Sequence, residues 1–576
     1  MALPNLVVSP GTLRVAYAYE LERFQASDTL KRFWAKDASL WPAKDPRVAM
    51  SMHLDWTALP EGLEGYSSRA VQTAGDIGQE FDDVVLIALG SSNLAAEMVS
   101  SLGLFAYGKR FFVLDSIHPE DLRTIERVIN PARTLFLLAS KTGKVIETHG
   151  LLLYFLEKLK AAGSNLPGQN FIALTEEDSY LRSLAAQYQF RNLFVDPAGI
   201  PGRFSGLIHF TLFLAALCKR DPGTMIREAR AMREACGPGV EVTKHPAATL
   251  AGLFAAGGEA GYERLAILTH PGLRPLANRL GQLVGTSSCS EGKGILPLFG
   301  VGPSIVDTIR GDYIAVCIRL SGMDNTEIQE ASARLEEVGV PTVLIDLERV
   351  EDLSAELFRW EIATCLACSA LGTNPFEAAE MDEGRGLAMD YLNKLSARQP
   401  AELPKPRIEH DGLQLFVEGA TRREISMLSM REAIRSLFGL LENDGFLGVL
   451  SFLPGLVDVS RIESLCSETG AALGVPVILG LGPRYLQISG QCFKGGPQKG
   501  VFLMLTSEIE NDIPVPGAGY TFGDLSMAMA LADFDLMSQR GRFIVRLHLT
   551  RGYAAGMTDL QKLIDLARVG IRRNPE

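Results

Sequence analysis

The feature that most constrains the fold of this chain is a regular alternation of short apolar runs with helix-like runs, which starts at residue 83. Five apolar runs occur before residue 200: DVVLIAL (83–89), RFFVLDS (110–116), TLFLLAS (134–140), NFIALTE (170–176) and NLFVDP (192–197). Runs of this length that are apolar almost throughout are typical of strands buried on both faces of a sheet. Because helix-like segments separate them, they predict a parallel sheet covered by helices on both sides, which is the doubly wound α/β class.

A second series of the same kind follows the polar stretch at 237–247. It includes RLAILT (264–269), YIAVCIRL (313–320) and PTVLIDL (341–347), and it predicts a second doubly wound domain. The segment 396–412 carries three prolines and is typical of a linker. The alternation of apolar and helix-like runs resumes beyond it, which predicts a third α/β part.

We therefore divide the chain into four parts. The predicted parts are a helical N-terminal extension (1–60), a first doubly wound domain (61–235), a second doubly wound domain (236–395) and a C-terminal α/β domain (396–576). The length of 576 residues agrees with this division, because single hydrophobic cores stop growing beyond roughly 250–300 residues.

The charge and apolarity of the chain limit the kinds of partner that it can bind. The formal net charge of -12 argues against nucleic acid or an anionic membrane as the main partner, so an anionic ligand must be met by local groups. The longest strongly apolar stretch, 207–218, is shorter than the roughly 20 residues that cross a bilayer. The N-terminus lacks the basic segment and apolar core of a secretory signal. We expect a cytoplasmic protein without a membrane segment.

The cysteines do not indicate a metal site. Cys365 and Cys368 form a C-x-x-C, but they lie in an apolar helix-like run with no second pair nearby, so we expect them to pack in the core. We expect neither a metal nor a cofactor.

Two hydroxyl-rich loops follow strands of the first predicted sheet. LGSSNL (89–94) ends the first apolar run, and SKTGK (140–144) ends the third. In a parallel sheet, ligands gather at the carboxyl ends of strands, where helix N-termini offer free N–H groups to anions. The predicted phosphate-binding residues are Gly90, Ser91, Ser92, Ser140, Lys141 and Thr142. The alternative is that these hydroxyls only cap helices.

The loops do not match a nucleotide-binding pattern. The first has one glycine where a dinucleotide fingerprint has three, and SKTGK lacks the spacing of a P-loop. The sequence therefore predicts a phosphorylated small molecule as ligand.

Five motifs together resemble the glucose-6-phosphate isomerase family. LGSSNL, SKTGKVIETHG, GRFSGL, EGKGILPL and LGTNPF occur here in the order found in that family. Two later stretches, GPRYLQISGQCFKGGPQKGVFL and YTFGDLSMAMALAD, resemble the isomerase half of bifunctional transaldolase/glucose-6-phosphate isomerase proteins. The resemblance covers roughly residues 60 to 555 and implies two sugar isomerase (SIS) domains, which interconvert an aldose and a ketose through an enediolate. It also implies a homodimer whose site is built partly from the facing subunit.

The resemblance assigns roles to several residues and marks substitutions in others. Arg203 matches the arginine that steadies the enediolate, and Glu147 matches an acid near the sugar. Thr286 stands where the relatives carry the catalytic glutamate, Gln487 where they carry a ring-opening histidine, and Arg385 where they carry a lysine. Each of these replacements has lower acid–base competence than the residue it replaces.

Three hypotheses follow for the function. The first is an isomerase that interconverts glucose 6-phosphate and fructose 6-phosphate. The second is a sugar-phosphate-binding protein without isomerase chemistry, either a sensor or an accessory to a separate transaldolase. The third is isomerisation of another phosphorylated sugar through Glu147 or Glu291, and Glu291 is a candidate because a shifted alignment of SEGKG places it at the position of the family base.

Overall fold

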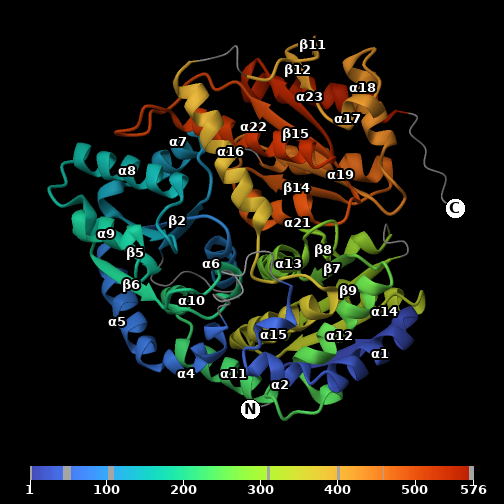
Figure 1. Ribbon diagram of the computed structural model, residues 1–576. Coiled ribbons are helices and arrows are strands. Elements are labelled where there is room, and N and C mark those ends of the chain that lie inside the picture. Colours follow the sequence, from blue (N-terminus) through green and yellow to red (C-terminus); the bar gives the residue numbers. More distant parts are fainter. Residues whose placement is uncertain are drawn as a thin grey trace.

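The computed structural model contains three sheets of mainly parallel strands with helices packed on their faces (Figure 1). It describes residues 3–42, 54–101, 109–307, 312–398, 403–457 and 459–569. The predicted α/β class with doubly wound parallel sheets is confirmed. In Figure 1 the first sheet lies at the left, the second at the lower right and the C-terminal sheet at the top, with α6, α13 and α21 between them.

The first sheet is entirely parallel and has the strand order β3-β2-β4-β5-β6. Its strands are β2 (Asp83–Ala88), β3 (Arg110–Leu114), β4 (Thr134–Ala139), β5 (Phe171–Glu176) and β6 (Asn192–Asp196). Its helices include α5 (Glu64–Glu80), α6 (Ser91–Ser101), α7 (Pro119–Val128), α8 (Ile146–Ala161), α9 (Tyr180–Gln187) and α10 (His209–Leu217). The chain leaves β2 towards β3 on one side and returns to β4 on the other, so a crevice opens at the carboxyl ends of β2 and β4.

The second sheet has the order β1-β10-β9-β7-β8. Its parallel strands are β7 (Arg264–Thr269), β8 (Leu296–Pro297), β9 (Tyr313–Leu320) and β10 (Thr342–Leu347). Helices α11 (Pro222–Ala235), α12 (Pro246–Glu259), α13 (Arg274–Ser288), α14 (Thr326–Glu337) and α15 (Leu353–Leu371) accompany it.

The sequence predicts a helical N-terminal extension, but the described part of that segment also contains a strand. It contains helices α1 (Arg14–Ala26) and α2 (Thr29–Trp34), but it begins with strand β1 (Asn5–Ser9), which pairs antiparallel with β10. The pairing explains the difference, because an edge strand of five residues depends on the strand beside it and leaves little signal in its own sequence.

The C-terminal sheet has the order β11-β12-β16-β15-β13-β14. Four of its strands are parallel: β13 (Phe446–Ser451), β14 (Val477–Leu481), β15 (Gly500–Ser507) and β16 (Phe543–Leu549). Strands β11 (Ile408–His410) and β12 (Leu413–Phe416) add to it antiparallel. Helices α18 (Met430–Gly439), α19 (Val459–Leu473), α20 (Arg484–Ile488), α21 (Gly490–Gly495), α22 (Phe522–Gln539) and α23 (Gly552–Arg568) complete this part, which we call the C-terminal unit (403–457 and 459–569).

Helix α16 (Ala379–Ser396) joins the second sheet to the C-terminal unit. The boundary predicted at residue 395 leaves it in the second domain, yet it packs along α22 of the C-terminal unit (Figure 1). Residues from two predicted parts therefore form one helical layer.

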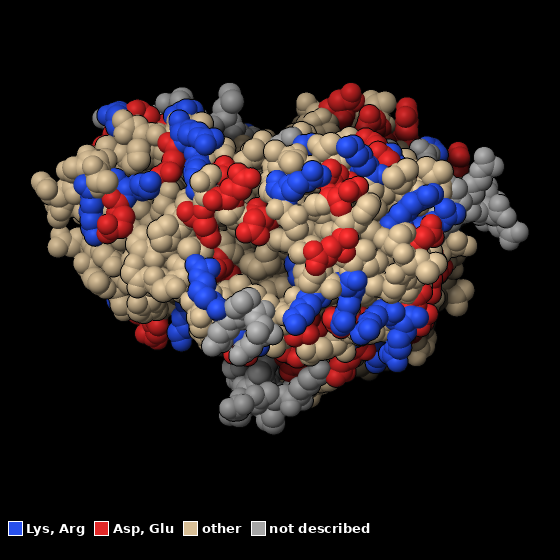
Figure 2. Space-filling view, turned by 90° about the horizontal axis from the view of Figure 1, so that it is seen from above, with Lys and Arg blue, Asp and Glu red and all other residues tan. Residues whose placement is uncertain are grey.

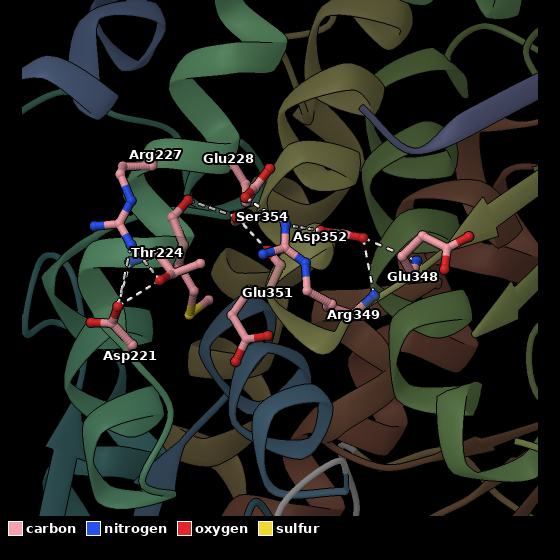
Figure 3. Close-up of polar contacts among 10 residues, drawn as sticks. Asp221, Thr224, Arg227, Glu228, Glu348, Arg349, Glu351, Asp352 and Ser354 are labelled. Atoms are coloured by element: carbon pink, nitrogen blue, oxygen red, sulfur yellow. Dashed lines mark hydrogen bonds and ion pairs between the residues drawn. The ribbon is translucent and has the colours of Figure 1, made fainter. Parts of the chain in front are cut away.

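A polar cluster fastens α11 to the start of α15 (Figure 3). The guanidinium of Arg349 lies 2.7 Å from a carboxylate oxygen of the fully buried Glu228 and 3.1 Å from one of Asp352. Asp352 also accepts the backbone N–H of Glu348 and of Arg349 at 3.0 Å each. These contacts hold the charged side chains at the junction of the two helices.

The surface carries both signs of charge. On the face that Figure 2 shows, the described Lys and Arg side chains are interspersed with Asp and Glu, as the acidic but mixed composition predicts. Within the described residues, no helix combines the length and the apolarity that a bilayer crossing requires. No group of three His, Cys, Asp or Glu side chains in that same part of the chain is arranged to hold a metal ion.

Candidate functional site

A cavity of about 600 Å³ lies at the carboxyl ends of β2 and β4. Every predicted site residue except Glu291 lines it: Gly90, Ser91, Ser92, Ser140, Lys141, Thr142, Glu147, Arg203, Thr286, Arg385 and Gln487. The walls come from the first sheet, from α13, and from α16, α20, α21 and α22. The crevice between β2 and β4 is the place where ligands bind in open α/β sheets, and its volume is typical of small-molecule sites.

The two loops of the first sheet form a polar end of the cavity, which we call the anion end. Ser140 is buried, and its hydroxyl accepts the backbone N–H of Gly143 at 3.2 Å, so the loop curls around this side chain. Gly143 has a φ of +69°, and a Cβ there would collide with the backbone nitrogen of Leu181. The close turn therefore requires glycine.

The second loop is shaped by contact with the C-terminal unit. Gly90 has a φ of +82°, and a Cβ there would lie 3.1 Å from the Cβ of Gln487. The hydroxyl of Ser91 donates to Oε1 of Gln282 at 3.1 Å. The loop thus presents its hydroxyls to the cavity while its backbone lies close to α20.

Lys141 is already engaged. Its ammonium lies 3.1 Å from a carboxylate oxygen of Glu176 and donates to the backbone carbonyl of Ile200. These contacts hold the positive charge at the edge of the anion end.

Arg203 is fixed by the backbone of the segment that precedes α16. Its Nε donates to the carbonyl of Pro375 at 2.9 Å and its Nη2 to that of Glu377 at 3.2 Å. Burial lowers the pKa of Arg203 to about 10, so the guanidinium stays charged at neutral pH. The side chain therefore presents a fixed positive charge to a ligand in the cavity.

Glu147 is a buried carboxyl in the first turn of α8. Burial raises its pKa to about 7, against an opposing effect of the positive charge of Arg385. A carboxyl with this pKa can both take up and release a proton near neutral pH. Of the predicted residues, Glu147 is the one whose acid–base chemistry fits proton transfer.

The three substituted positions lie together and bond to one another or to the backbone. The Thr286 hydroxyl donates to the carbonyl of Ile488 at 3.2 Å, and Nη2 of Arg385 donates to Oε1 of Gln487 at 3.2 Å. Arg385 also pairs with Asp382 at 2.7 Å. The site therefore keeps the positions that the resemblance assigns, but with hydrogen-bonding residues in place of acids and bases.

The structure does not bring Glu291 to the cavity. Its side chain is exposed on the turn that follows α13, where the backbone φ is +54°, and it does not line the cavity walls.

Sequence reasoning missed Gln282, whose side chain connects the loop after β2, helix α13 and helix α20. Its Oε1 accepts from Ser91 and, at 2.9 Å, from the buried Arg279, while its Nε2 donates to the carbonyl of Gln487 at 2.8 Å. Arg279 donates in turn to the carbonyl of Arg203 at 3.0 Å. The available signal was helical spacing, since Gln282 lies four residues before Thr286 on one face of α13.

Sequence reasoning also missed a buried ion pair in the cavity wall. Lys494 of α21 lies 2.5 Å from one carboxylate oxygen of Asp533 of α22, and the hydroxyl of Tyr485 donates to the other at 2.5 Å. Both charged side chains line the cavity. The pair joins two helices that are separated in the sequence, so the residues around Lys494 or Asp533 give no sign that the two side chains meet.

Comparison with known proteins places the chain near one family. No family model matches it. It is 30% identical over 176 residues to a glucose-6-phosphate isomerase from Carboxydothermus hydrogenoformans, an alignment that covers 29% of this chain and 38% of that relative. It is also 30% identical over 182 residues to a glucose-6-phosphate isomerase from Thermus thermophilus, an alignment that covers 31% of this chain and 43% of that relative. The chain thus spans about two fifths of the length of these curated relatives.

A more distant relative aligns over a longer stretch. A probable glucose-6-phosphate isomerase from Natronomonas pharaonis is 24% identical over 414 residues, which is 66% of this chain and 89% of that protein.

Solved structures show the same fold. A hypothetical protein from Thermus thermophilus superimposes with a TM-score of 0.58 at 20% identity, covering 67% of this chain and all of its own. A glucose-6-phosphate isomerase from Chlamydia trachomatis superimposes with a TM-score of 0.50 at 17% identity, covering 65% of this chain and 79% of its own. Taken with the sequence matches, these findings show that the chain is related to the glucose-6-phosphate isomerase family.

Proposed function

We propose that the cavity binds a phosphorylated sugar and that the protein is a sugar-phosphate isomerase whose simplest reaction interconverts glucose 6-phosphate and fructose 6-phosphate. The observation that carries the proposal is the meeting of both hydroxyl-rich loops, Arg203 and a carboxyl with a pKa of about 7 in one cavity. Relatives that carry the name glucose-6-phosphate isomerase support the same class of reaction.

In the proposed reaction the phosphate occupies the anion end, where hydroxyls and backbone N–H groups supply donors. Glu147 removes the proton from C2 of the open-chain sugar and returns it to C1. In the enediolate between these transfers the hydroxyl proton of O2 passes to O1, so that O1 ends as a hydroxyl and C2 as a carbonyl. Arg203 stabilises the negative charge of the enediolate between these two transfers. Thr286 does not act as a base, because a hydroxyl does not ionise near neutral pH.

A coupled assay on the purified chain tests this reaction. In the variant Glu147→Gln, the loss of the acid–base group should lower turnover by about 10² to 10⁴-fold, while fructose 6-phosphate still raises the melting temperature. Turnover of the unchanged protein at the rate of a heat-killed control would reject the isomerase activity. Equal turnover of Glu147→Gln and the unchanged protein would reject the role of Glu147.

A second candidate is a binding protein without isomerase chemistry, either a sensor or an accessory to a separate transaldolase. The observation that favours it is the set of hydrogen bonds that engage Thr286, Arg385 and Gln487 in place of titrating groups. It predicts thermal stabilisation by fructose 6-phosphate with no turnover. A rise in turnover in the variant Thr286→Glu would then show that the threonine at position 286 is the cause of the lost isomerase activity.

The cellular setting and the assembly belong to the same proposal. We propose a cytoplasmic protein that forms a homodimer, as the resemblance implies. Within this chain, the C-terminal unit and α16 supply walls of the cavity beside the first sheet.

A further inference from the structure

The cavity has a second wall whose chemistry differs from that of the anion end. We call it the apolar wall, and it consists of Met381, Ala388 and Met389 of α16, Leu486 of α20, and Leu525 and Met529 of α22. The anion end, by contrast, is built from hydroxyl and lysine side chains of the first sheet. A ligand that touches both surfaces meets polar donors in one place and methionine and leucine side chains in the other.

The apolar wall follows from helical spacing. Met381, Ala388 and Met389 recur at seven and eight residues along α16, so they share one face of that helix. Leu525 and Met529 are four residues apart on α22 and share a face in the same way. The two faces meet because α16 packs along α22.

The wall is not fully covered by the protein itself. Leu525 and Met529 are 1% and 7% exposed, but Met389 is 44% exposed although it lines the cavity. Methionine is flexible and polarizable, so it adapts to apolar groups of different shape. An exposed methionine at the rim of a cavity gains when an apolar group covers it.

The polar groups on this side of the cavity are engaged with one another. Arg385 bonds to Asp382 and Gln487, and Lys494 bonds to Asp533. An unsubstituted hexose phosphate carries hydroxyls on nearly every carbon. Hydroxyls pressed against methionine and leucine lose water without gaining partners, which costs free energy.

We infer that the ligand of this cavity is a phosphosugar that carries an apolar substituent, an acyl or alkyl group of a few carbons. The phosphate lies in the anion end, and the substituent lies on the apolar wall. The inference rests on the proposed sugar-phosphate site, but it goes further, because an unsubstituted hexose phosphate would satisfy that site and leave the apolar wall uncovered.

Calorimetric titration of the full chain with a matched series of probes tests the inference. The probes are glucose 6-phosphate and glucosamine 6-phosphate with an N-acetyl, N-propionyl or N-butyryl group. Each added methylene should raise the affinity about threefold to fourfold, as expected when a methylene moves from water onto an apolar surface. Affinity that is flat or falls along the acyl series, while glucose 6-phosphate binds, overturns the inference and leaves the proposed function standing. If no compound in the series binds, both fail.

A pair of variants assigns the gain to the wall. Met389→Gln should bring the ratio of N-butyryl to N-acetyl affinity close to one, whereas Met389→Leu should retain the ratio. Leu428→Gln is the matched control, because Leu428 is 91% exposed and lies outside the cavity lining. An unchanged ratio in Met389→Gln would overturn the placement of the substituent.

Discussion

The first sheet and the C-terminal sheet share a strand order but use its crevice differently. The parallel strands run in the order β3-β2-β4-β5 in the first sheet and β14-β13-β15-β16 in the C-terminal sheet. In each sheet the chain passes from the earliest parallel strand to a neighbour on one side and then crosses to a neighbour on the other side. At the first crevice the loops line an open cavity. At the C-terminal one, the backbone N–H groups of Gly455 and Leu456, just after β13, donate at 2.9 and 2.8 Å to the carboxylate of Asp121.

The comparison teaches that the same strand order can leave a cavity at the strand ends or tie a loop to another part of the molecule. Backbone N–H groups at the end of a strand attract an anion. In the C-terminal sheet that anion is the side chain of Asp121, which is fully buried and comes from α7 beside the first sheet. Asp121 therefore fastens the loop after β13 to the first sheet, and the cavity of about 320 Å³ that Gly455 and Leu456 line beside it is smaller than the one at β2 and β4.

The second sheet repeats the order as β8-β7-β9-β10 and shows a third outcome. After β7, the ring Nδ1 of His270 accepts the backbone N–H of Gly272 at 3.0 Å. Here the loop satisfies its own donor.

The largest expected effect concerns the shape of the open crevice. Gly143→Ala should destabilise the protein by about 3 kcal/mol or more, because the alanine is strained at positive φ and its Cβ collides with the backbone of Leu181. Gly517→Ala is the control, since its φ is +73° but no atom lies within 4 Å of the added Cβ, and it should cost about 1 kcal/mol. Urea denaturation measures both. Equal losses would show that the close approach to Leu181 does not shape the loop.

A similar effect is expected for the carboxyl in the open crevice. The pKa of Glu147 is raised from 4.5 to about 7, so between these values the folded protein binds more protons than the unfolded chain, and stability is lost as the pH rises through this window. Glu147→Gln cannot lose a proton. It should exceed the unchanged protein in stability by about 3 kcal/mol at pH 8 and match it near pH 4. A difference that does not change between the two pH values would contradict the raised pKa.

Substitution of Asp121, which holds the loop after β13, should change stability in the opposite sense. Asp121→Ala removes the acceptor of two backbone N–H groups and should cost about 2 kcal/mol of unfolding free energy. The thermal shift produced by glucose 6-phosphate should remain, because Asp121 does not line the cavity. Calorimetric melting with and without ligand measures both quantities, and a lost ligand shift would mean that the two crevices are not independent.

The smallest effect is expected in the second sheet. His270→Ala removes one cap and should cost about 1 kcal/mol. A loss as large as that of Asp121→Ala would remove the distinction between a local cap and a contact that joins two parts. The same denaturation series provides the measurement.

The anion end could be predicted from the sequence because its signals are local. Each loop follows directly on an apolar strand, so Ser91 and Ser140 could be placed at the same sheet edge from strand order alone. Glu147 and Arg203, by contrast, were assigned through the resemblance to the glucose-6-phosphate isomerase family.

The rest of the site depends on tertiary packing that no local pattern carries. Gln282 lies on α13, whereas Lys494 and Asp533 lie on two helices of the C-terminal unit, and each resembles an ordinary helical residue in its local sequence. Asp121 reads as an acidic residue in a first helical turn, where such residues are common in any case. Glu291 is the first residue of the motif EGKGILPL, yet the turn after α13 directs it to the surface.

The packing of α16 along α22 has a consequence for any shortened form of the protein. Arg385 and Met389 of α16 line the cavity, and the helix packs along α22 of the C-terminal unit. A chain cut at residue 395, the boundary predicted from the sequence, would keep both side chains but lose the surface that holds their helix in place. Such a fragment should therefore bind the ligand far more weakly than the full chain.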